Sequence, residues 1–217
     1  MNKLVLSIIV ILATTFSACN SHTTEKTSKK YVPLEITVEQ PIHISMNDIT
    51  REALITRGKW LSRQVKYALK TELHKSVKAN GLEGTIDFCR DRAFQITDSV
   101  SKANQIMVKR AALKNRNPLN AMDDFETKVY KNFVISWINK GPIHGKILIN
   151  ELNQPVYYNV MTMKKFCLNC HGDSEQINPE VAKKIKELYP DDRAVDFTIM
   201  QPRGMWKITF PEYYVEQ

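Results

Sequence analysis

Two cysteines and a histidine stand close together in the run Cys167-Leu168-Asn169-Cys170-His171-Gly172. The pattern Cys-x-x-Cys-His is the attachment sequence of a c-type haem. In such a site each cysteine sulfur adds to one vinyl group of the haem, and the histidine imidazole binds the iron from one side. The run therefore predicts one covalent haem c held by Cys167 and Cys170, with His171 as an iron ligand.

Two other chemistries use a pair of cysteines at this spacing. A zinc site would need two further Cys or His residues at similarly close spacing, and the sequence has no second pair of this kind. A thiol redox pair is expected beside a βαβ pattern, which the sequence lacks. The haem interpretation is therefore favoured over both.

The first residues have the features of a targeting segment. Residues 1–18 contain Lys3, then the apolar run Leu4–Ala13, then small residues up to Cys19. This order is typical of a secretory signal, and the apolar run is short for a membrane span, so an uncleaved anchor helix is the weaker alternative. Because Phe16-Ser17-Ala18-Cys19 resembles a bacterial lipobox, with Phe16 departing from the usual aliphatic residue, we expect a lipid on Cys19. The predicted product is an exported lipoprotein, anchored in a membrane and facing the periplasm or the cell surface.

Composition and charge limit the remaining possibilities. The chain has 217 residues, of which 43% are hydrophobic and 25% charged, and this predicts one globular domain behind the targeting segment. The formal net charge of +8 favours an acidic protein partner or anionic headgroups, and we expect no nucleic-acid partner for an exported chain. Arg116, Lys114 or Arg110 could pair with the haem propionates, although each could equally be an ordinary surface charge.

The periodicity of apolar residues predicts helices first and strands afterwards. Residues 19–44 are predicted to form a polar tether, and a long helix capped by Asn47 or Asp48 should end at Asn80-Gly81. The later elements are a helix over about Thr85–Ser101, a helix begun by a capping box of Asp123 and Glu126, strands over Lys146–Leu152 and Val156–Met163, a helix over Pro179–Leu188 capped by Asn178, and strands over about Ala194–Met200 and Met205–Phe210. The fold class is therefore predicted to be α+β, with an antiparallel sheet in a domain that covers residues 45–217.

The order of these motifs resembles a known family. The motifs are the helix with Ile86-Asp87-Phe88-Cys89, the basic segment Leu113–Asn120 before the acidic helix start, the run Cys167–Gly172, and Tyr189-Pro190-Asp191-Asp192-Arg193-Ala194. Together they are similar to the single-haem c-type cytochrome domain with a PAS-like fold. That family includes free-standing exported cytochromes and the extracytoplasmic haem input domains of bacterial sensor kinases. The chain departs from the family's pattern at Val195–Phe197 and Met200–Pro202, where glycine-rich positions are expected.

The resemblance implies a second iron ligand. In that family the iron lies between the motif histidine and a cysteine thiolate, which correspond to His171 and Cys89. Cys89 is also the one cysteine without another assignment, and the predicted helix places it near a helix start, where the dipole favours a thiolate. Two alternatives stay open, namely a buried structural cysteine at Cys89 and a methionine ligand. The candidate methionines are Met161, Met163, Met200 and Met205.

Three classes of function fit a single c-type haem. The first is a cytochrome that passes electrons to a redox partner protein, and the second is a redox or gas sensor that acts through a separate signalling protein. The third is a haem peroxidase, in which His144 or His74 would serve as the distal base. We do not expect an enzyme, because either histidine is more often an ordinary surface or core residue.

Overall fold

The structure is a computed structural model and describes residues 40–216. The predicted signal segment, Cys19 and most of the tether lie outside these residues. The helices are α1 (Asp48–Asp91), α2 (Ala93–Asn104), α3 (Asp124–Ile138), α4 (Leu168–His171) and α5 (Pro179–Leu188), with short 3₁₀ turns η1 (Pro118–Asn120) and η2 (Lys165–Cys167). The strands are β1 (Ile42–Ile44), β2 (Met107–Ala111), β3 (Lys146–Ile149), β4 (Pro155–Thr162), β5 (Pro202–Thr209) and β6 (Tyr213–Val215). This composition confirms the predicted α+β class.

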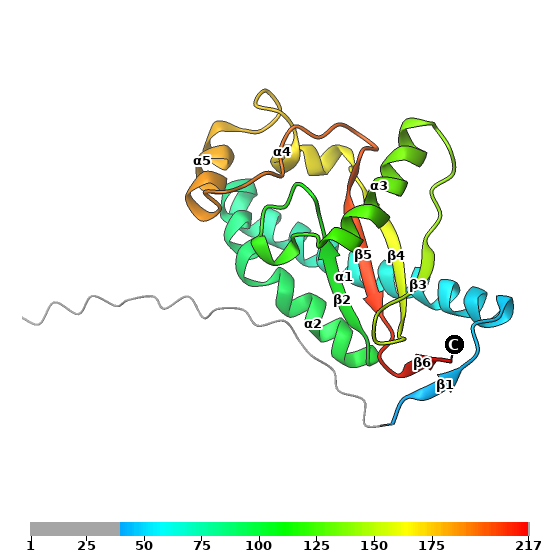
Figure 1. Cartoon of the computed structure of the whole chain (residues 1–217). Coiled ribbons are helices and arrows are strands. Elements are labelled where there is room, and N and C mark those ends of the chain that lie inside the picture. Colours follow the sequence, from blue (N-terminus) through cyan, green and yellow to red (C-terminus); the bar gives the residue numbers. More distant parts are fainter. Residues whose placement is uncertain (1–39, 217) are drawn as a thin grey trace, which may run out of the picture. The chain divides into compact units, whose positions relative to one another are not determined.

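A four-stranded antiparallel sheet with the order β2-β5-β4-β3 forms the centre of the fold. Successive side chains of a strand point to opposite faces. Tyr157 of β4 packs with Leu61 of α1 on one face, whereas Tyr158 packs with Phe133 of α3 on the other. Helices α1 and α3 therefore cover opposite faces of the sheet (Figure 1).

The long helix α1 changes direction at Gly81. Its N-cap is Asn47, whose side chain accepts a hydrogen bond from the Thr50 backbone N–H at 2.9 Å, as predicted. Gly81 has φ 68° and ψ −177°, a conformation that a residue with a Cβ rarely adopts. The helix predicted to end at Asn80-Gly81 does break there, and a second arm of α1 begins directly after Gly81. The predicted helix over Thr85–Ser101 is divided between this arm, which ends at Asp91, and α2, which begins at Ala93. Cys89 consequently lies in the last turn of α1, and the expected position near a helix start is wrong.

The capping box at the start of α3 is confirmed and also serves the core. Asp123 accepts from the Glu126 N–H at 2.7 Å, and Glu126 accepts from the Asp123 N–H at 3.2 Å. The Glu126 side chain is fully buried and pairs with Lys109 at 2.7 Å and Lys207 at 2.9 Å. A single carboxylate thus joins the start of α3 to β2 and β5.

We expect replacement of Glu126 by alanine to lower the free energy of unfolding by about 3 kcal/mol, because it leaves two ammonium groups without their carboxylate. Glu126→Gln should cost less, since an amide oxygen can still accept from the Asp123 N–H. Chemical denaturation followed by circular dichroism measures both values. A loss below about 0.5 kcal/mol for Glu126→Ala, the range of ordinary surface substitutions, would contradict this role.

Three features of the structure differ from the sequence predictions. Ala194–Met200 is not a strand, because Asp196 and Met200 have positive φ values of 60° and 66°. Strand β2 was not predicted, although it pairs with β5 along its whole length. Strand β1 pairs in parallel with β6, so the folded part begins before the predicted boundary at Ser45.

Candidate functional site

The Cys-x-x-Cys-His run folds into one short helical segment. Strand β4 is followed by η2 and α4, which place Cys167 and Cys170 three residues apart with His171 next in the chain. Both thiols are free and partly buried, as is that of Cys89. Figure 1 shows α4, α5 and the second arm of α1 at one end of the sheet, where Cys170 packs against the apolar cluster of Ile86 and Tyr189.

The imidazole of His171 is held in one orientation. Its Nδ1 lies 2.7 Å from the Ala194 carbonyl oxygen. Because a carbonyl oxygen can only accept, Nδ1 carries the proton and donates this hydrogen bond, and Nε2 is the unprotonated nitrogen. Burial and then the charges of Arg116 and Arg203 lower the pKa of His171 well below its ordinary value. A neutral imidazole with a fixed tautomer is the form in which histidine binds a metal.

Arg116 lies beside this segment and contacts it directly. Its Nη2 donates to the Cys170 carbonyl at 2.6 Å and to Asp192 Oδ2 at 3.0 Å. Its Nε is buried and has no hydrogen-bond partner among the described residues. Burial, followed by the charge of Arg116, lowers the pKa of Arg203 to about 10. Two crowded guanidinium groups and an unused N–H fit an anionic group such as a haem propionate, so this pairing stays a prediction.

The other two candidate propionate partners are engaged elsewhere. Lys114 donates from Nζ to the Val195 carbonyl and lies over the Phe197 ring, 4.9 Å from its centroid. The guanidinium of Arg110 lies 5.5 Å from the centroid of the Phe94 ring. Arg116 is therefore the candidate whose contacts reach the Cys-x-x-Cys-His run directly.

Cys89 lies close to the same run. Burial is the main cause that raises the pKa of Cys170 to about 11, and the charge of Cys89 raises this pKa further. Burial also raises the pKa of Cys89, against the lowering effect of Arg110 and Arg116. The helix dipole does not favour a thiolate here, because Cys89 lies in the last turn of α1. A thiolate at Cys89 therefore depends on the neighbouring arginines and on a bound metal.

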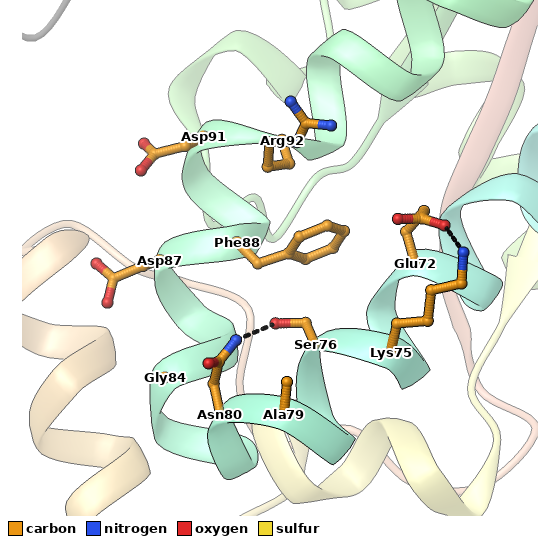
Figure 2. A pocket seen from close by; sticks show the side chains of 10 residues that line it. All are labelled: Glu72, Lys75, Ser76, Ala79, Asn80, Gly84, Asp87, Phe88, Asp91 and Arg92. Carbon is orange, nitrogen blue, oxygen red and sulfur yellow. Dashed lines mark hydrogen bonds and ion pairs between the residues drawn. The ribbon is translucent and has the colours of Figure 1, made fainter.

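Phe88, which precedes Cys89 in the second arm of α1, lines a hollow between the two arms. A hollow of about 740 Å³ lies on the inner side of the α1 kink and is lined by Phe88, Glu72, Lys75 and Asp87 among others. Figure 2 shows the Phe88 ring pointing into the space between the two arms, above the Asn80–Ser76 hydrogen bond. Since adjacent helical residues differ by about 100° in direction, this places Cys89 on a different side of the helix from the hollow.

The methionines predicted as rival ligands are distributed over several environments. Met163 is 1% exposed and packs in a cluster with Leu168 that Cys167 adjoins, so it is the rival beside the motif. Met205 is buried against α3, and Met200 is half exposed and accepts from Lys164 Nζ at 3.3 Å. Met161 lines a hollow of about 310 Å³ between α1 and β4.

The two histidines considered for a peroxidase are also separated. His74 is exposed and contacts the edge of the Phe166 ring at 5.0 Å between centroids, and Phe166 precedes Cys167. His144 is exposed in the connection between α3 and β3. The described residues contain no group of three or more His, Cys, Asp or Glu side chains arranged to hold a metal ion. The zinc alternative therefore gains no support from residues 40–216.

Sequence reasoning missed the two groups that complete this site, Asp192 and the Ala194 carbonyl. Both lie in the segment Tyr189–Ala194, which resembled the family pattern but gave no indication of a role.

No helix in the described part of the chain is long and apolar enough to cross a membrane.

The comparisons with known proteins agree on one relationship. The model of the Tll0287-like family matches residues 11–211. The crystal structure of the cyanobacterial heme-protein Tll0287 is similar in fold, with a TM-score of 0.53 and 21% sequence identity. The similarity covers 76% of this chain and 97% of that chain. A search of the curated proteins found no match.

Proposed function

The chain belongs to the Tll0287-like family, and on this premise we propose that it is an exported c-type cytochrome that carries one covalent haem. Cys167 and Cys170 would hold the haem through thioethers, and His171 and Cys89 would bind its iron. The protein passes electrons to a partner protein or reports its redox state to one. The similarity in fold to a cyanobacterial heme-protein supports the haem in this proposal.

One observation carries the proposal. His171 directly follows a pair of free cysteines at the attachment spacing, and its Nδ1 proton is donated to the Ala194 carbonyl. This arrangement leaves Nε2 as the free nitrogen of an imidazole whose direction is fixed, which is what an axial iron ligand requires.

The residues of the chain have separate tasks in this mechanism. The bound haem supplies one-electron exchange at its iron. Cys167 at the end of η2 and Cys170 in α4 would hold the haem, and the Ala194 carbonyl holds the direction of His171. The apolar cluster of α1 and α5 around Cys170 excludes water from one side of the motif. A second ligand from Cys89 would close the iron to substrates, so the proposed protein is a carrier or sensor and not an enzyme.

A redox titration of the purified mature protein, followed by absorption spectra with and without carbon monoxide, tests this function. We expect a six-coordinate, low-spin iron in both oxidation states and no change on adding carbon monoxide. Carbon monoxide binding to the ferrous form would favour a gas sensor in which the second ligand leaves the iron. Turnover of hydrogen peroxide by an open ferric iron would favour a peroxidase.

The proposed location gives a further prediction. Cys19→Ala should move the protein from the membrane fraction to the soluble exported fraction, because the lipid is its proposed membrane contact. Cell fractionation and immunoblotting measure the change, and Ser21→Ala, which keeps the lipid-accepting cysteine, should remain in the membrane fraction. Equal membrane retention of Cys19→Ala would indicate an uncleaved anchor helix.

A further inference from the structure

We propose that Arg116 and Asp192 are positioning residues for His171, and that their ion pair holds the Ala194 carbonyl at the imidazole Nδ1. The inference rests on the proposed function, since it takes His171 to be the iron ligand. It gives Arg116 a role that differs from binding a propionate, and it gives Asp192 a role for the first time.

The four contacts form a closed ring of hydrogen bonds. His171 Nδ1 donates to the Ala194 carbonyl at 2.7 Å, and the Ala194 N–H donates to Asp192 Oδ1 at 2.9 Å. Arg116 Nη2 donates to the other carboxylate oxygen, Asp192 Oδ2, at 3.0 Å. The same nitrogen donates to the carbonyl of Cys170 at 2.6 Å, and Cys170 is bonded to His171 through the main chain. The Ala194 and Cys170 peptides, on either side of the imidazole, are thus connected through Asp192 and Arg116.

The central pair of this ring is buried. The side chains of Arg116 and Asp192 are 10% and 7% exposed, respectively. A buried pair loses much of its stabilising effect when one partner is removed, because the other charge is left without compensation. The pKa of Arg203, lowered by burial and by Arg116, is raised again by Asp192. The carboxylate of Asp192 therefore compensates two guanidinium groups beside the imidazole.

Other backbone bonds hold the segment in place independently of this pair. The Asp192 N–H donates to the Tyr189 carbonyl at 3.0 Å, and the Phe197 N–H donates to the His171 carbonyl at 3.0 Å. The Arg193 N–H donates to the Asn115 carbonyl at 3.1 Å. Loss of the Arg116–Asp192 pair should therefore turn the Ala194 peptide without detaching the segment from the motif.

A turned Ala194 carbonyl has a defined effect on the iron ligand. A hydrogen bond from Nδ1 raises the basicity of a metal-bound imidazole, and a more basic ligand favours ferric over ferrous iron. Weakening this bond should consequently raise the midpoint potential. It should also expose the Nδ1 proton to exchange with water, because its acceptor is no longer held in position.

The experiment uses the mature haem-loaded protein and two readouts, the midpoint potential and the solvent exchange rate of the His171 Nδ1 proton by NMR of the ferrous form. We expect Asp192→Ala and Arg116→Ala to retain covalent haem and to shift the ferric–ferrous equilibrium about tenfold towards ferrous, about 59 mV for one electron. The double variant should shift it by less than the sum of the two single variants, because both residues belong to one ring of contacts. Arg116→Lys, which keeps the charge and a donor, should shift it less than Arg116→Ala.

The control is Glu212→Gln, which weakens the Arg57–Glu212 ion pair near β6 and should leave both readouts unchanged. If Asp192→Ala fails to accumulate, Asp192→Asn carries the same test, since it keeps the shape of the side chain and an acceptor for the Ala194 N–H. Unchanged potential and unchanged proton exchange in the loaded variants would overturn the positioning role. Failure of the unmutated protein to bind haem covalently would instead overturn the proposed function.

Discussion

Replacing both Cys167 and Cys170 with alanine is expected to abolish covalent haem attachment. Each thioether requires one of these sulfurs, and the structure places both, free and partly buried, in the short segment that ends at His171. After expression with a cytochrome c maturation system, the intact mass of the unmutated protein should exceed that of the polypeptide by one haem. The double variant should have the polypeptide mass alone.

Extraction with acidified acetone gives an independent measurement. Haem should stay with the unmutated polypeptide and with each single variant, because one thioether is sufficient to retain it. Cys89→Ala is the matched control, since it also removes a partly buried thiol close to the motif but should retain covalent haem. Haem that is extracted from the unmutated protein would contradict c-type attachment.

Local signals in the sequence predicted the starts of α3 and α5. The capping box of Asp123 and Glu126 and the start of α5 at Asn178-Pro179 are found where they were predicted. In both cases the side chain that caps the start of the helix accepts from a backbone N–H two or three residues further on. Such contacts depend on neighbouring residues alone, so the sequence pattern is sufficient to locate them.

Contacts between distant segments account for the differences. The backbone of Ala194–Met200 bonds to the Cys-x-x-Cys-His-Gly segment, through the Asp196 N–H and the Gly172 carbonyl at 2.8 Å, instead of to a neighbouring strand. Asp196 and Met200 adopt positive φ values in the two stretches where the family pattern has glycine. The break at Gly81 was predicted, but the end of the second arm at Asp91 and the separate start of α2 at Ala93 were not.

The sequence predicted the Cys-x-x-Cys-His part of the candidate site but not the groups that surround it. The spacing of Cys167, Cys170 and His171 is a property of the sequence itself. Cys89 is 78 residues before Cys167 in the numbering, so its proximity to the motif was suggested by the family resemblance and not by spacing. The Ala194 carbonyl is a backbone group with no sequence signature. Asp192 contacts Arg116 and the Ala194 N–H only because of the way its segment folds, which the sequence pattern does not indicate.

Replacing Cys89 with alanine is expected to change the iron more than any other single substitution away from the motif. An anionic thiolate stabilises ferric iron, so the unmutated protein should have a potential well below that of cytochromes with a His/Met ligand pair. Without the thiolate the ferric iron should become high-spin or bind another ligand, and the midpoint potential should rise. Covalent haem should be retained, because neither thioether is altered.

Electron paramagnetic resonance, the ferric absorption spectrum and a redox titration together measure this change. Met163→Leu is the matched control, because Met163 is the buried rival beside Leu168 and Cys167 and leucine preserves its apolar volume. If Cys89 is the ligand, Met163→Leu should keep the low-spin ferric spectrum and the low potential, whereas Cys89→Ala loses both. The opposite pattern would assign the ligand to Met163. An unchanged spectrum and potential in Cys89→Ala would mean that burial alone explains this cysteine, since burial raises the pKa of its thiol and favours the protonated form.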